Sequence, residues 1–152
     1  MFLDGGSTFR TARNLTTFGS QPSKSVAATD VFSPGESTEW YKFRIGNGRF
    51  VRSSIVSMTG RFDDIEAQMT LNVFASSKNG KRPGRNIGRF DAITSSQSFG
   101  TLKPGTYYIN ANWVAGTGWT PQPRFAFGLV FAQDAGLLTR SQKQSPNLRD
   151  WK

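Results

Sequence analysis

The sequence contains no histidine and no cysteine among its 152 residues. Without these two residue types the chain cannot form a Ser-His-Asp triad, a Cys-His nucleophile, a thiolate or imidazole zinc site, a haem–histidine bond or a disulfide. Catalysis would have to rely on a pair of carboxylates, a lysine or tyrosine base, or an ion bound through oxygen atoms. We therefore expect a protein that is not an enzyme.

Acidic residues are also scarce, with 10 Asp and Glu against 19 Lys and Arg, so the net charge is +9 and the isoelectric point is about 10.5. Aromatic residues make up 13% of the chain and include 13 phenylalanines, which can bury enough area for one hydrophobic core. This composition excludes wholesale disorder. A strongly basic surface favours an acidic partner.

No long apolar segment is present. The longest, "FAFGLVFA" at residues 125–132, is far too short to cross a membrane, and the N-terminal stretch meets an acid at Asp4 without an apolar signal region. We expect no membrane span and a location in the cytoplasm or in a large intracellular assembly. An extracellular location would require a signal sequence that has been removed.

Apolar and polar residues alternate in four segments, at residues 39–45, 67–75, 105–115 and 124–132. This period of two predicts antiparallel strands with one face in the core. The residues expected to face the core are Tyr41, Phe43, Ile45, Met69, Leu71, Val73, Tyr107, Ile109, Ala111, Trp113, Phe125, Phe127, Leu129 and Phe131. The spacing predicts an all-β fold, an antiparallel, jelly-roll-like β-sandwich of about seven to nine strands in residues 1–134, followed by an extended basic tail in residues 135–152.

Other segments carry weaker signals. In residues 49–60 the alternation slips around Ser53 and Ser54, which predicts a bulge or an edge strand. Residues 76–88 and 115–124 are rich in Gly, Asn and Pro and are expected to be loops. Residues 7–15 could hold one helical turn, but we expect them to run along the surface of the sandwich.

Four stretches in the same order resemble the bacterial pre-peptidase C-terminal domain, in the free-standing form common among cyanobacteria. They are "DGGSTFRTARNL", "ESTEWYKFRI", "FDDIEAQMTLNVF" and "LKPGTYYINANW", of which "PGTYYI" is the most specific. The resemblance spans about Asp4 to Ala132 and leaves the basic tail uncovered. It implies a jelly-roll-like sandwich without catalytic activity, an accessory or binding module that sometimes holds calcium.

One cluster of carboxylates, Asp63, Asp64 and Glu66, matches the acidic segment of that family. Calcium needs several converging oxygen ligands, and Asp4 or Asp30 would add to the set. The alternative is that these acids occupy a turn and pair with nearby cations on the basic surface.

Cations are concentrated in two other places. Residues 76–91 contain no acid before Asp91, and the tail ends in an aromatic residue on a basic arm. We expect an acidic partner to contact the loop cations and the arm, with the tryptophan as an anchor. The alternatives are a solvated loop and a frayed terminus. The candidate residues are Lys78, Lys81, Arg82, Arg85, Arg89, Arg140, Lys143, Arg149 and Trp151.

These features favour a structural or linker protein that docks a β-sandwich onto an acidic multisubunit protein assembly, such as a phycobilisome-like antenna, a virion or a filament. The alternative is an exported module that binds calcium or a carbohydrate, with Trp113, Trp119 and Tyr108 stacking on sugars. We do not expect nucleic acid as the partner, because no nucleic-acid-binding module is recognisable.

Overall fold

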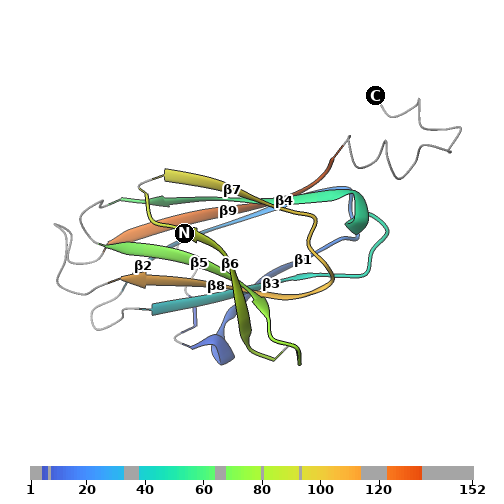
Figure 1. Cartoon of the computed structure of the whole chain (residues 1–152). Helices are drawn as coiled ribbons and strands as arrows, with labels where there is room; N and C mark the ends of the chain where they lie inside the picture. The colour runs from blue at the N-terminus through green and yellow to red at the C-terminus, as the bar shows by residue number, and fades with distance from the viewer. Residues whose placement is uncertain are drawn as a thin grey trace, which may run out of the picture.

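The computed structural model describes residues 5–6, 8–32, 38–63, 68–79, 81–92, 94–113 and 123–134. These residues form two packed β-sheets and two single-turn 3-10 helices (Figure 1). The elements are η1 (Phe9–Thr11), β1 (Arg13–Phe18), β2 (Ser23–Val31), β3 (Thr38–Ile45), η2 (Val51–Ser53), β4 (Ser54–Phe62), β5 (Met69–Ser76), β6 (Pro83–Phe90), β7 (Thr94–Gly100), β8 (Gly105–Trp113) and β9 (Arg124–Gln133). The predicted all-β sandwich is confirmed.

The two sheets have the strand order of a jelly roll. The four-stranded sheet runs β2-β9-β4-β7, and the five-stranded sheet runs β1-β3-β8-β5-β6. From β2 onward all pairings are antiparallel, and eight strands divide between the sheets as in a double-sheet jelly roll. Strand β1 is an addition at one edge, paired in parallel with β3.

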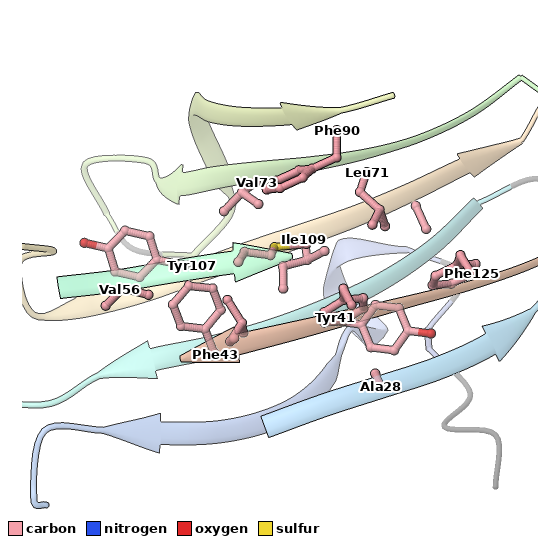
Figure 2. Close-up of a cluster of buried hydrophobic side chains, with 14 of the residues drawn as sticks. Ala28, Tyr41, Phe43, Val56, Leu71, Val73, Phe90, Tyr107, Ile109 and Phe125 are labelled. Carbon is pink, nitrogen blue, oxygen red and sulfur yellow. The ribbon is translucent and has the colours of Figure 1, made fainter. Parts of the chain in front are cut away.

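The core lies between the sheets, and the four alternating segments supply most of it, together with residues of other strands such as Ala28, Val56 and Phe90 (Figure 2). Every residue that the alternation placed in the core is buried, from Tyr41, at 0% exposure, to Trp113, at 8%. Aromatic rings join the two sheets. Phe18 stacks on Phe131 with 5.5 Å between ring centroids.

Strand β6 corrects the sequence prediction, which placed a loop at residues 76–88. Only the turn after Ser76 is a loop, and Pro83 already begins a strand that pairs with β5. Strand β6 lies at a sheet edge, where proline is tolerated at the first position because no neighbour needs its missing N–H. Pairing with β5 therefore imposes the extended conformation on a sequence without an apolar pattern.

Strand β4 was predicted as a bulged or edge strand. It is central, between β9 and β7, so the edge alternative is wrong. Its register against β7 does shift, between Val56 and Ser57. The slip in alternation at Ser53 and Ser54 has another cause, because the 3-10 turn η2 ends there and β4 begins.

The face of β8 that points away from the core is covered by the N-terminal turn. Residues 7–15 do hold one turn, η1, and its Phe9 ring lies 6.3 Å from Tyr108 and 6.2 Å from Trp40. The helical turn, the less favoured of the two alternatives, is present, and from Arg13 the chain does not run along the surface but forms β1 and pairs with β3. Most of the second predicted loop, residues 115–124, lies outside the described residues.

Candidate functional site

One end of the sandwich is rich in cations. At this end β3, β5 and β7 finish and β4, β6 and β8 begin, as the strand registers show. We call it the basic end, and its cations are all exposed. They are Lys24, Arg44, Arg49, Arg52, Lys78, Lys81, Arg82, Arg85 and Lys103. In the part of the chain that the structure describes, Asp134 is the one acidic residue at this end.

The remaining acids of the described chain lie toward the opposite end or in the interior. Asp30 and Glu39 are buried. Asp63 forms an ion pair with Arg124 at 3.4 Å, and Asp91 forms one with Arg89 at the same distance. Within the described residues, positive charge is therefore concentrated at one end of the strands.

The turn between β5 and β6 presents three of the cations. Asn79 braces it by accepting hydrogen bonds from the Ser77 hydroxyl, at 2.7 Å, and from the Lys81 N–H, at 3.0 Å. The Ser77 N–H donates to the Arg82 carbonyl at 2.8 Å and closes the hairpin. The hairpin extends away from the body of the two sheets (Figure 1), so its cations reach solvent.

Two adjoining pockets open at the basic end. The first, which we call the polar pocket, has a volume of about 460 Å³. Its walls carry two cations and several hydroxyl groups. They are formed by Arg44, Ala75, Ser76, Ser77, Lys78, Pro104, Gly105, Thr106 and Tyr107. No acidic side chain lines it, so an anion is the ligand that its charges favour.

The second pocket has a volume of about 450 Å³, and its lining is mixed, with two cations and two serine or threonine residues beside Ile87, Phe99 and Leu102. We call it the apolar pocket after these three side chains. It is lined by Ala75, Arg85, Ile87, Ser98, Phe99, Thr101, Leu102, Lys103 and Tyr107. Ala75 and Tyr107 belong to both pockets, so together they form the partition between them. This lining suits a group that is partly apolar and partly anionic.

Tyr107 fixes the geometry of this partition. Its ring stacks on Phe43 with 5.3 Å between centroids, and its hydroxyl donates to the Lys103 carbonyl at 2.7 Å. Burial raises the pKa of the Tyr107 hydroxyl, and the hydrogen bond to Lys103 opposes that shift. The hydroxyl therefore stays protonated at neutral pH and holds the β7–β8 connection, with Lys103, in place.

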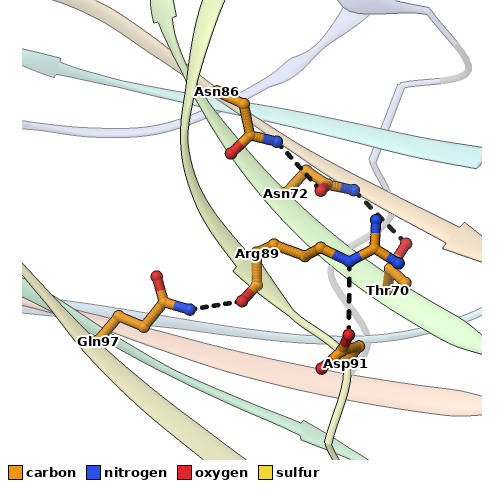
Figure 3. A network of polar contacts seen from close by, with 6 residues as sticks. All are labelled: Thr70, Asn72, Asn86, Arg89, Asp91 and Gln97. Carbon is orange, nitrogen blue, oxygen red and sulfur yellow. Dashed lines mark hydrogen bonds and ion pairs between the residues drawn. The ribbon is translucent and has the colours of Figure 1, made fainter.

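The structure assembles the predicted loop cations only in part. Lys78, Lys81, Arg82 and Arg85 lie at the basic end, on the β5–β6 turn and the start of β6. Arg89 lies near the far end of β6, where its guanidinium contacts Asp91 (Figure 3). Arg89 therefore does not belong to the same cluster.

Sequence reasoning missed two cations of the pockets, Arg44 and Lys103. Arg44 comes from β3 and Lys103 from the connection before β8. The registers of β3 with β8 and of β8 with β5 bring Arg44 to the polar pocket beside Lys78, and Lys103 lines the apolar pocket with Arg85. Neither lies near the basic run in the sequence, and only the water-facing position of Arg44 on its predicted strand was a signal.

Of the three candidate calcium residues, only Asp63 can be described, because Asp64 and Glu66 lie outside the described residues. Asp63 uses both of its oxygens on Arg124: Oδ1 accepts from the Arg124 N–H at 2.8 Å, and Oδ2 pairs with Nε at 3.4 Å. No group of three or more potential metal-binding acids occurs within the described ranges. The calcium site stays a prediction.

Two of the three residues expected to stack on sugars, Trp113 and Tyr108, are buried and cannot contact a sugar. Trp113 is 8% exposed and packs on Phe32 in the core, and Tyr108 is 5% exposed under Phe9. The expectation for these two residues is wrong, because both faces of β8 are covered. The third, Trp119, lies outside the described residues, as do the tail residues Arg140, Lys143, Arg149 and Trp151.

No protein-family model and no curated protein matches the sequence, so the resemblance to the pre-peptidase C-terminal domain stays a prediction. Within the described residues, no helix has the length and apolar character needed to cross a membrane.

Several solved structures are similar to the chain. PliG of Aeromonas hydrophila, a periplasmic inhibitor of g-type lysozyme, is 13% identical with a TM-score of 0.40, over 78% of this chain and 97% of that one. A chitosan-binding module of a Paenibacillus chitosanase/glucanase is 10% identical with a TM-score of 0.41, over 73% and 95%. The Yersinia pseudotuberculosis-derived mitogen is 12% identical with a TM-score of 0.42, over 73% and 86%.

Proposed function

We propose that this protein is a non-catalytic binding protein that docks on an acidic protein assembly through its basic end. The observation that carries the proposal is the cluster of exposed cations around the two pockets. Within the described chain, no acidic side chain pairs with Arg44, Lys78, Arg85 or Lys103. Clustered like charges repel one another, so an acidic partner surface is the complement that would offset this cost.

The cations at this end act at two ranges. Exposed charges that protrude on the β5–β6 turn attract an acidic surface over about 10 Å at 0.1 M salt and speed the encounter. Cations that line the pockets, such as Arg44 and Lys103, would then contact individual carboxylates of the partner. Association should therefore be strong at low salt and weak at high salt.

A matched pair of charge variants tests the proposal. The first changes three cations of the basic end, Lys78, Arg85 and Lys103, to glutamine. The second changes three exposed cations elsewhere, Arg10, Arg13 and Arg61, to glutamine. Both variants lose the same net charge, so a difference between them reports position. Each protein is mixed at low and high salt with an extract of its own cells, and sedimentation measures its share in large complexes.

We expect the basic-end variant to bind about tenfold more weakly at low salt, because three exposed ion pairs each contribute up to about 1 kcal/mol. The control variant should lose little, and high salt should release both proteins along with the unmodified protein. Equal weakening in the two variants would show that net charge alone drives association. No large complex at low salt would contradict the proposal.

A further inference from the structure

The apolar pocket has a hydrophobic floor that simple charge attraction does not need. Leu102 is 9% exposed, and Phe99 and Ile87 are half-buried against the core cluster. The Phe99 ring also packs edge-on against Phe90, with 6.5 Å between centroids. These contacts hold the floor in place, so the pocket is formed before any ligand arrives.

The rim of the same pocket is cationic and polar. Arg85 and Lys103 are exposed at its edge. The Thr101 hydroxyl donates to the Ser54 carbonyl at 2.6 Å, which ties the β7–β8 connection to β4 of the four-stranded sheet. The pocket thus offers a fixed apolar floor beneath two positive charges, and the polar pocket with Arg44 adjoins it across Tyr107.

We propose that the basic end binds a short linear peptide of its partner, in which an aromatic side chain enters the apolar pocket and flanking acidic residues contact the surrounding cations. This inference rests on the proposed function and names the recognised element. One acidic residue would face Arg85 and Lys103, and another would face Arg44 in the polar pocket. An extended peptide advances about 3.3 Å per residue, so a few residues cover both pockets.

Other occupants fit the pocket less well. A polyanion without apolar groups would leave the Phe99 and Leu102 surface unused. The chain's own tail carries Arg140, Lys143, Arg149 and Lys152 against Asp150, so cations would face cations. A peptide with acidic and aromatic residues complements both the charge and the hydrophobic floor.

Three labelled pentapeptides separate the two contributions. One has a central phenylalanine with two acidic residues on each side, the second has alanine at the centre, and the third keeps the phenylalanine between uncharged amides. Binding to the full chain is measured by fluorescence anisotropy at low and high salt. We expect the acidic phenylalanine peptide to bind at least tenfold more tightly than the acidic alanine peptide. Burial of a phenylalanine side chain stabilises a complex by more than the free energy that corresponds to a tenfold change in affinity. The ratio should persist at high salt, since apolar burial is not screened.

Variants of the chain assign the effect to the pocket. Phe99→Ala should remove the preference for phenylalanine, whereas the double change Arg85→Gln and Lys103→Gln should weaken both acidic peptides by a similar factor. Because Phe99→Ala could unfold the edge of the sheet, the unmodified chain provides a second measurement. In amide NMR spectra, the phenylalanine peptide should shift Ile87, Phe99 and Leu102, and the alanine peptide should not.

Two failures are distinguishable. If both acidic peptides bind equally and salt removes both, the inference is overturned while docking through charge stands. If neither acidic peptide binds and the basic-end variant behaves like its control in extract, the proposed function fails as well. A short DNA duplex that shifts the same three amides, with no shift from any peptide, would also overturn the inference.

Discussion

Asp30 shows at the residue scale how a carboxyl group is accommodated inside this sandwich. It is 3% exposed, and its oxygens accept hydrogen bonds from the Tyr41 hydroxyl at 2.6 Å, the Gly5 N–H at 3.1 Å and the Val31 N–H at 2.8 Å. A buried carboxyl group without such donors would be costly. The three bonds join the N-terminal segment to both sheets, because Tyr41 lies on β3 and Asp30 on β2.

The hydroxyl of Tyr41 should therefore contribute measurably to stability. Tyr41→Phe removes a donor to a buried carboxyl group, and we expect the free energy of unfolding to fall by about 1.5–3 kcal/mol. Urea denaturation followed by tryptophan fluorescence measures this change. Tyr108→Phe is the matched control, because the structure gives its hydroxyl no hydrogen bond to any described residue, and it should cost less. Equal losses in the two variants would argue against the role of Asp30.

Among the elements, the β7–β8 connection matters most for the site. The Thr101 hydroxyl bonds to the Ser54 carbonyl, the Tyr107 hydroxyl bonds to the Lys103 carbonyl, and Leu102 is buried between them. Residues 101, 102 and 103 are thus each held in place, and this short loop carries Lys103, one cation of the apolar pocket. The β5–β6 hairpin is held by backbone pairing, by the bond from the Asn86 amide to Asn72 at 3.2 Å, and at its turn by Asn79.

The anchor at Tyr107 has a consequence for stability at alkaline pH. Burial raises the folded-state pKa of Tyr107 above the ordinary value of 10.0, so the folded chain holds this proton more tightly than the unfolded chain does. Its contribution is fully present below about pH 10 and is lost as the pH rises through the folded-state pKa. Tyr107→Phe should be less stable at neutral pH and should lose less stability between pH 9 and pH 11. Denaturation across this range checks the slope, and identical slopes would contradict the assignment.

For the whole molecule, the dominant feature is the separation of charge along the strands. The basic end carries exposed cations from several connections and strand ends, whereas Asp63 and Asp91 pair with arginines toward the other end. Such an arrangement orients the molecule as it approaches an acidic surface. The core between the sheets does not depend on this charge, since its buried residues are almost all apolar.

The last prediction concerns the tail, whose residues lie outside the described part of the chain. The buried cluster ends with Phe131 on β9, which pairs on both sides with β2 and β4. Removing residues 139–152 should therefore leave the melting temperature nearly unchanged. Association with an acidic assembly should weaken, because the deletion removes Arg140, Lys143, Arg149 and Lys152 together with Trp151. Trp151→Ala should reproduce most of the loss. A lower melting temperature with unchanged binding would show instead that the tail belongs to the folded domain.

The sequence by itself determined the sandwich, because period-two alternation encodes which face of a strand is buried. Four segments with that pattern, such as residues 39–45 and 124–132, are strands with the expected residues in the core. Strands without the pattern were not predicted. Strand β7, for example, is mostly polar, with three serines among its seven residues, and lies at a sheet edge, where its conformation comes from pairing with β4.

Only the tertiary structure decided which cations act together. The basic run around Lys78 was visible in the sequence, but Arg44 and Lys103 join it through pairing between strands that are distant along the chain. The same pairing carries Arg89 away to Asp91 and closes the apolar pocket over Phe99 and Leu102. A sequence records local spacing, whereas a pocket depends on contacts between remote segments, which only the folded chain makes.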